Sequence, residues 1–386
     1  MKTKVLFILL TGCLLALAAW LVHEPNPAQA DEIPEKYRET VSKGLEYLAK
    51  NQHKDGHWEG DGGKHPVAMT GLVGLALLME GGDPAGMLPK HSNGRWVGVT
   101  GGKHWTNIRK AVDWLMDKSQ PKRDGLIFSE HSSETARYME GHGLATLLLA
   151  GVCIAENDRA RQKKLIDVLT TAVKYIASAR STQGGWYHTS KVEGHDFDAI
   201  SATVIQIQAL QAAENAGVPV PHGTINDAQE YLKMALGKYE EKAKARQKGS
   251  RPTDTAAALA GCISQSSMIV NGIRLEGQLK DELAKNWLKY CQAEIPVGRA
   301  IKFGRDELTH YYYAQAMFNL GNDTWTGYRT ATFDYLQSGQ NKDGSWPAGD
   351  DIGVGPVYAT ALWCIILQLD KRTHPSIPPI GLMIQT

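Results

Sequence analysis

The sequence predicts an all-α fold, a single (α/α)6 toroid in which six helix pairs form a closed double ring. Apolar residues recur at helical spacing along most of the chain, and no run alternates as a strand does. A turn motif also recurs, which indicates a repeat architecture. Hydrophobic residues make up 42% of the chain and charged residues 22%, values that exclude disordered and disulfide-scaffold proteins.

The clearest copies of the turn motif read Gln-x-x-Asp-Gly-x-Trp. They occupy residues 52–58 and 340–346, and each follows an amphipathic run. A shorter copy lies at 183–186, and a weaker one begins at Asp124. Glycine accepts the positive φ of a tight turn, and we expect the tryptophan to pack back on the completed helix or on its neighbour. The structural residues of the motif are Gln52, Asp55, Gly56 and Trp58; Gln183, Gly184 and Trp186; and Gln340, Asp343, Gly344 and Trp346.

Each turn is expected to join a charged outer helix to an inner helix rich in small and apolar residues. Charged outer helices face water, and small residues let the inner helices approach closely. The strongest motif copies lie in the first and last pairs, which favours a closed ring over an open solenoid with atypical ends. The expected outer helices span 37–50, 107–118, 164–179, 226–239, 278–292 and 325–337. The expected inner helices span 69–79, 141–154, 199–213, 255–263, 311–320 and 357–369.

Residues 1–30 have the pattern of a secretory signal peptide, which leaves 31–386 as the toroid domain. Lys2 and Lys4 precede an apolar run, and a small-x-small cleavage site ends at Ala30. We therefore expect export to the periplasm or the extracellular space. A membrane-anchored form is the alternative, because the apolar run is nearly long enough to span a bilayer. A lipoprotein is another, because Cys13 follows a lipobox-like Leu-Thr-Gly.

The sequence indicates no metal, no cofactor and no nucleic-acid partner. His53, His57 and His65 share a loop, but their spacing fits no standard metal site. No phosphate-binding loop or dinucleotide fingerprint occurs, and basic and acidic residues nearly balance, at 42 and 41. The cysteines beyond the leader lie far apart in apolar stretches, and we expect buried free thiols. They are Cys153, Cys262, Cys291 and Cys364.

Gln-x-x-Asp-Gly-x-Trp turns around a double ring resemble those of the squalene–hopene cyclase and protein prenyltransferase β-subunit superfamily. The resemblance covers essentially all of 31–386 and implies a central cavity for an apolar, isoprenoid-like ligand. The acid motif of the cyclases is Asp-x-Asp-Asp-Thr-Ala. This chain has Asp196-Phe197-Asp198-Ala199, which keeps the two spaced carboxylates but lacks the third. The Asp-x-Cys pair of the zinc-dependent prenyltransferases is absent.

Two clusters carry the residue types needed for acid–base chemistry. Asp198 is the candidate general acid, supported by Asp196, in an apolar cavity that would keep one carboxyl protonated. Glu140 and His142 form a second cluster of carboxylate and imidazole. Tyr138 shares a helix face with His142, four residues later. Ordinary capped helix starts are the competing explanation for both clusters.

The ligand cavity of a toroid is expected to open where its inner helices begin. Tyr138, His310, Tyr311 and Tyr358 fall at such helix starts and are the expected cavity residues. Aromatic faces there would contact an apolar ligand or steady a developing positive charge.

Three functions are compatible with these features. The preferred one is an exported repeat protein that binds, and as an enzyme converts, an apolar isoprenoid-like ligand. The second is a non-catalytic toroid that presents a cavity or surface to a protein, glycan or lipid. The third is an α/α-toroid polysaccharide lyase or glycosidase, because the clusters supply arginine, histidine, tyrosine and carboxylates. Whether the protein is an enzyme stays open at this point.

Overall fold

The chain is mostly α-helical, as expected for the all-α class. The computed structural model describes residues 33–81, 90–92, 95–97, 102–120, 123–244, 252–263, 268–270, 273–275, 282–320, 322–349 and 354–370. The expected signal peptide at 1–30 lies outside these residues. Cys153, Cys291 and Cys364 are buried free thiols, as expected. The side chain of Cys262 is outside the described part.

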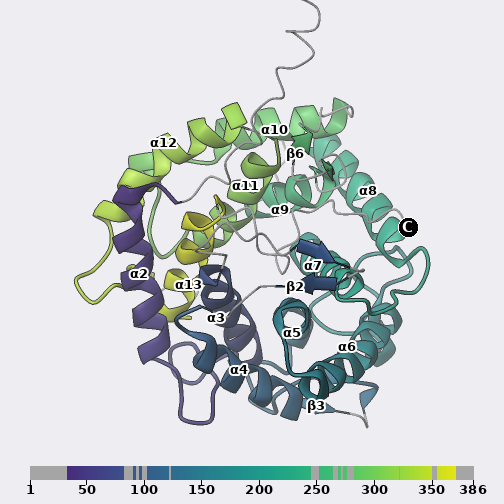
Figure 1. The fold of residues 1–386 in the computed structure, drawn as a ribbon. Helices are drawn as coiled ribbons and strands as arrows, with labels where there is room; N and C mark the ends of the chain where they lie inside the picture. Colours follow the sequence, from purple (N-terminus) through teal and green to yellow (C-terminus); the bar gives the residue numbers. More distant parts are fainter. Residues whose placement is uncertain are drawn as a thin grey trace, which may run out of the picture.

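Outer and inner helices alternate along the described chain, and Figure 1 shows the inner set enclosed by the outer set. Each expected helix overlaps an observed one, with ends shifted by a few residues. The outer helices are α2 (Glu35–Lys50), α4 (Trp105–Asp117), α6 (Arg159–Ala179), α8 (Thr224–Lys244), α10 (Glu282–Glu294) and α12 (Asn322–Ser338). The inner helices are α3 (Pro66–Glu80), α5 (Tyr138–Ala155), α7 (Ile200–Asn215), α9 (Pro252–Ile263), α11 (Glu307–Leu320) and α13 (Pro356–Leu367).

The inner helices contact one another in a closed order. Helix α3 packs on α5, α5 on α7, α7 on α9, α9 on α11, α11 on α13, and α13 returns to α3. A Cβ atom on Gly71 would lie 2.7 Å from the backbone of Leu144, so α3 and α5 meet this closely only through glycine. At the joint between α13 and α3, Gln368 Nε2 donates to the carbonyl of Ala76 at 3.0 Å.

The first and last outer helices also meet, purple α2 beside green α12 in Figure 1. Lys36 Nζ and Tyr37 Oη both donate to Asp334 Oδ1, at 2.7 and 2.8 Å. Gln337 Nε2 donates to the carbonyl of Lys36 at 2.7 Å. Residues 298 positions apart in the sequence are therefore bonded directly.

Three turns hold a fully buried tryptophan in the same geometry. In the first turn, Trp58 Nε1 donates to the Leu48 carbonyl of the outer helix at 2.7 Å. The backbone N–H of Trp58 donates to Thr70 Oγ1 on the inner helix at 2.9 Å. The tryptophan thus ties the two helices of its pair together, as the motif predicted. The matching contacts are Trp186 to Ile176 and Thr203, at 2.7 and 3.0 Å, and Trp346 to Leu336 and Thr360, at 2.8 and 3.1 Å.

In the first and last turns, the motif glutamine links the turn to a neighbouring outer helix. Gln52 Nε2 donates to the Gly56 carbonyl within the turn and to the Asn107 carbonyl of α4, both at 2.8 Å. Gln340 Nε2 donates to the Gly344 carbonyl and to the Thr40 carbonyl of α2, both at 2.9 Å. The last turn therefore closes onto the first outer helix.

The glycine of the turn sets the spacing between neighbouring outer helices. Gly56 has φ of +106°, and a Cβ atom on it would lie 2.5 Å from the Lys110 carbonyl of α4. Such a turn also occurs at Gly298, which the sequence analysis missed because Ala300 stands where the tryptophan would be. The other pairs in this relation are Gly125 with Thr171, Gly184 with Asp227, Gly298 with Ala331, and Gly344 with Lys43.

Short antiparallel hairpins lie between some of the helices, so the expectation of no strands is wrong at these places. Strands of two or three residues are too short to show an alternating pattern. They are β1 (Lys90–Ser92) with β2 (Arg95–Val97), β3 (Ser119–Gln120) with β4 (Leu126–Ile127), and β5 (Met268–Val270) with β6 (Ile273–Leu275). Single 3-10 turns occur at η2 (Lys191–Glu193) and η3 (Gly298–Ala300).

Helix α5 is the one helix among the described residues with the length and apolar character of a membrane span. Its mean hydropathy is 1.3 over 18 residues, and 94% of that stretch is buried inside the protein. It contacts α3, α6 and α7, as a core helix does.

Gly344→Ala should lower the free energy of unfolding by about 2–4 kcal/mol, since a Cβ atom adds backbone strain and overpacks α2. Gly62→Ala is the matched control, because Gly62 also has positive φ, +72°, but no atom within 4 Å of the added carbon. It should cost about 1 kcal/mol. Urea unfolding measures both, and equal losses would contradict the contact with α2.

Candidate functional site

Asp196 and Asp198 lie in the loop before α7, and both bind the turn that ends α6. Asp196 accepts hydrogen bonds from Thr182, from N at 2.8 Å and from Oγ1 at 2.7 Å. Asp198 Oδ1 accepts a hydrogen bond from Ser181 Oγ. Asp196 is exposed, and its bonds to Thr182 lower its pKa. The expected pair in an apolar cavity is therefore wrong, and both carboxylates hold the turn that contains Gln183.

His142 is fully buried and occupied at both ring nitrogens. Its Nδ1 accepts from the Ile127 backbone N–H at 3.0 Å, and its Nε2 lies 3.2 Å from the Ala172 carbonyl. Ile127 stands where other turns have tryptophan. His142 therefore accepts the backbone hydrogen bond that Thr70 and Thr203 accept in their turns. Burial lowers the pKa of His142 to about 4. The expected acid–base role is wrong, because no nitrogen of this ring is left for a ligand.

The hydroxyl of Tyr138 and one ring nitrogen of His310 are hydrogen-bonded within the fold. Tyr138 Oη donates to Glu193 Oε2 at 2.6 Å and accepts from the Ser190 backbone N–H at 2.7 Å. His310 Nδ1 lies 2.8 Å from Tyr328 Oη on the outer helix α12, and burial lowers the pKa of His310 to about 4. The Nε2 of His310 is buried and has no hydrogen-bond partner among the described residues, and the placement of Tyr138 and His310 along a ligand cavity stays a prediction.

Glu140, in contrast, stands on the first turn of α5 with one oxygen held and one uncommitted. Its Oε1 accepts from Arg137 Nη2 at 2.8 Å and lies 2.5 Å from His188 Nδ1. Its Oε2 is buried and has no hydrogen-bond partner among the described residues. Buried carboxylate oxygens are normally paired, so this atom is available to a ligand or a proton. The side chain is 14% exposed.

Three tyrosines from α11 and α13 gather at the same end of the inner helices. Tyr311 and Tyr312 are buried, and Tyr358 is half-buried. Burial, with the nearby Tyr311, Tyr358, Glu140 and Asp254, raises the pKa of Tyr312 well above its ordinary value. Burial also raises the pKa of Tyr358, with Glu140 among the further contributors. Tyr312 and Tyr358 both sense the charge of Glu140, and all three lie near the starts of their inner helices.

Side chains from α7 and α11 bridge the interior of the ring beneath this site. Tyr312 Oη donates to the Ser201 carbonyl at 3.4 Å. One turn deeper, Gln208 Nε2 donates to Gln315 Oε1 at 2.7 Å, and both amides are buried. The helices α7 and α11 both flank α9, so these bonds cross the inner side of α9. Direct hydrogen bonds therefore join α7 to α11 below Tyr311.

Two further carboxyls at inner-helix starts are buried and hydrogen-bonded by backbone. Glu134 Oε1 accepts from the Val67 N–H at 2.7 Å, and Oε2 accepts from the Ser129 N–H at 3.2 Å. Glu307 accepts from the Gly304 N–H. Burial raises the pKa of each carboxyl to about 7, so both are partly protonated near neutral pH.

Sequence reasoning missed the partner of Glu140. His188 lies 48 residues from Glu140 and carries no motif of its own. One signal was present: His188 follows the motif tryptophan Trp186 by two residues, on the path to the next inner helix. No protein-family model matches the chain, and no curated protein matches it.

His142→Thr tests the structural role, because threonine is found at the same place in α3, α7 and α13. His142 stays neutral when folded, so the stability it provides is present above its unfolded pKa of about 6.5 and is lost as the pH falls toward 4. The wild type should therefore lose its advantage over the variant, by about 2 kcal/mol between pH 7.5 and pH 5. Urea unfolding at both pH values measures this, and a constant difference would contradict it.

Proposed function

We propose that the chain is a single (α/α)6 toroid of the squalene–hopene cyclase and prenyltransferase-like type. Two features support this reading of the fold: the closed order of contacts among the inner helices, and the recurring clasp of tryptophan, glutamine and glycine. The proposal includes export of the protein after removal of residues 1–30, as the N-terminal sequence pattern indicates.

The proposed function is binding of an apolar, isoprenoid-like ligand where the inner helices begin. The observation that carries it is that Tyr311, Tyr312 and Tyr358 lie near the starts of α11 and α13, while Glu140 lies at the start of α5 and contributes to the pKa of Tyr312 and Tyr358. Tyrosine rings offer large apolar faces to a prenyl chain, and their π-systems stabilise positive charge. Glu140 Oε2 supplies an uncommitted carboxylate oxygen at the same place. If the ligand is converted, Glu140 takes the role of acid or base that Asp198 was expected to have.

The depth of the site limits which ligands fit. The Gln208–Gln315 pair lies one helical turn below Tyr311, which is about 6 Å along the helix axis. An isoprenoid chain would therefore enter by one end and remain partly outside the ring. Binding of a short prenyl group, or of the end of a longer one, is the form of the proposal that this geometry supports.

A glycan is the second candidate ligand, and a specific contact favours it. Arg137, Glu140 and His188 are joined by hydrogen bonds at 2.8 and 2.5 Å. A cation, a carboxylate and an imidazole within one network are the groups needed to neutralise an acidic sugar and move a proton. Arg137 is 54% exposed at its side chain, so a polysaccharide would reach it from solvent.

Native mass spectrometry of the purified protein, after exposure to a lipid extract of its host, tests the first proposal. A retained isoprenoid mass is expected, and Tyr358→Ala should lower its retention about tenfold through loss of one aromatic face. Asp198→Asn is the control and should retain the ligand, because Asp198 holds a turn elsewhere.

The outcomes separate the two candidates. Loss of retention in Asp198→Asn with none in Tyr358→Ala would place the ligand away from the tyrosines and sink the first proposal. A ligand-free mass, with binding of an acidic polysaccharide that Arg137→Ala abolishes, would favour the glycan. Absence of binding in both assays would contradict both.

A further inference from the structure

The first turn of the ring brings together three side chains with metal-ligating atoms: His53, His57 and Glu59. Their ligand atoms all lie within 4.8 Å of one another. The turn follows α2, far from the tyrosines of the proposed ligand site in sequence. We propose that these three residues bind one transition-metal dication of the Zn²⁺ class. The expectation of no metal rested on the spacing of His53, His57 and His65, whereas the fold pairs the first two with Glu59.

Each carboxylate oxygen of Glu59 lies close to one imidazole nitrogen, and a bound ion would draw the three ligand atoms together from within 4.8 Å of one another. Glu59 Oε1 lies 3.4 Å from His53 Nε2, and Glu59 Oε2 lies 3.3 Å from His57 Nε2. A tetrahedral zinc ion with bonds of 2.0–2.2 Å holds its ligand atoms about 3.3 Å apart. Two imidazoles and a carboxylate are also the donor set that zinc and neighbouring transition metals accept.

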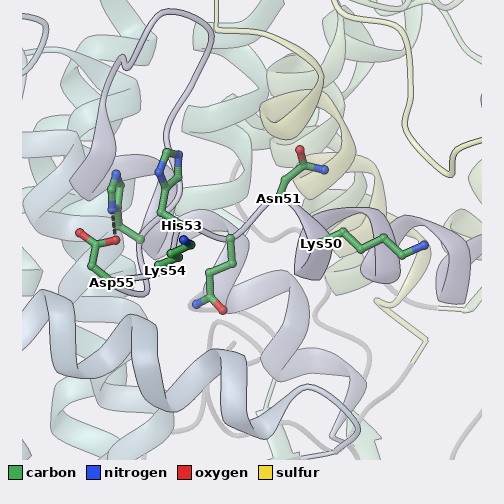
Figure 2. A pocket seen from close by; sticks show the side chains of 7 residues that line it. Lys50, Asn51, His53, Lys54 and Asp55 are labelled. Atoms are coloured by element: carbon green, nitrogen blue, oxygen red, sulfur yellow. Dashed lines mark hydrogen bonds and ion pairs between the residues drawn. The ribbon is translucent and has the colours of Figure 1, made fainter.

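Contacts on both faces and at one ring nitrogen hold the imidazole of His57 in place. Its Nδ1 lies 2.6 Å from Asp55 Oδ1, the contact marked by a dashed line in Figure 2. Its ring stacks between His53 and Trp114, at centroid distances of 4.3 and 4.9 Å. A carboxylate on one ring nitrogen fixes the proton there and leaves the other nitrogen as a metal donor.

This arrangement calls for a positive charge between His57 and Glu59. In the tautomer whose Nδ1–H donates to Asp55, the lone pair of His57 Nε2 faces Glu59 Oε2 at 3.3 Å. Two acceptors at this distance repel each other unless a proton or a metal ion lies between them.

The last turn of the ring shows that the fold does not require these histidines. Asn341 and Ser345 occupy the places of His53 and His57. The backbone N–H of the first residue donates to the carbonyl of the second in both turns, at 2.9 Å in the first turn and 2.8 Å in the last. Asp343 bonds Ser345 as Asp55 bonds His57. Pro347 stands where Glu59 would be. The turn therefore forms without imidazoles, and their presence in the first copy needs a separate reason.

The site is open on one side. It borders a surface pocket of about 540 Å³ whose wall includes His53, Asp55 and His57. In Figure 2, His53, Lys54 and Asp55 project from the loop that follows α2, whose last residue is Lys50. The side chains of His53 and Glu59 are 45% and 31% exposed. Three protein ligands with solvent access leave a coordination position for water or a small ligand.

The test is calorimetric titration of the purified, chelator-treated protein with Zn²⁺. One ion per chain is expected to bind to the wild type. The double variant His53→Asn, His57→Ser carries the residues of the last turn, so it should fold normally and bind Zn²⁺ on the order of a hundredfold more weakly. X-ray absorption at the zinc edge should show two imidazole ligands in the wild type. Glu59→Gln is the second variant and should also weaken binding.

His222→Asn is the matched control, because His222 is an exposed histidine outside the cluster. It should bind Zn²⁺ as the wild type does, and all variants should have the same urea midpoint in the presence of chelator. Stoichiometric binding that survives the double variant would overturn the proposal. So would a wild type that binds no Zn²⁺, since the contacts would then be hydrogen bonds only.

Discussion

The structure depends on one clasp, in which a buried tryptophan bonds both helices of its pair. The indole N–H satisfies a carbonyl near the end of the outer helix, where carbonyls lack partners within the helix. The backbone N–H of the same residue bonds a threonine on the inner helix. The glycine two residues before the tryptophan lies so close to a neighbouring outer helix that a Cβ atom would not fit. One short segment therefore fixes the geometry within a pair and between pairs.

The repeat made the positions of the helices predictable from the sequence, but it did not reveal the roles of individual polar side chains. Trp58 and Trp346 marked their turns because their partners are local and their spacing recurs. His142 looked catalytic beside Glu140, but the inner helix uses that position for the clasp, and histidine substitutes there for threonine. A helix position is visible in sequence, whereas the distant group that it meets is not. Glu140 joins His188 only because the segment that follows Trp186 passes the first turn of α5.

Burial gives the molecule two opposing responses to pH. His142 and His310 stay neutral, so their contribution to the free energy of unfolding falls as the pH falls from about 6.5 toward 4. Glu134 and Glu307 keep their protons up to about pH 7, so their contribution to the free energy of unfolding falls as the pH rises from about 4.5 to 7. The two trends offset in mildly acidic solution. Single variants, compared with the wild type, separate them.

Closure of the ring has a consequence for how the chain acquires its structure. Hydrogen bonds join Lys36 and Tyr37 to Asp334 across almost the whole sequence. One side of α3 is covered only by α13, the last inner helix. Local pairs form early, because each clasp spans few residues, but the final joint closes the longest loop in the molecule. Until the last pair is synthesised, α3 exposes an apolar face. The two ends of the helical domain then lie side by side. The domain is therefore suited to circular permutation, in which these ends are linked and new ends are made in another loop.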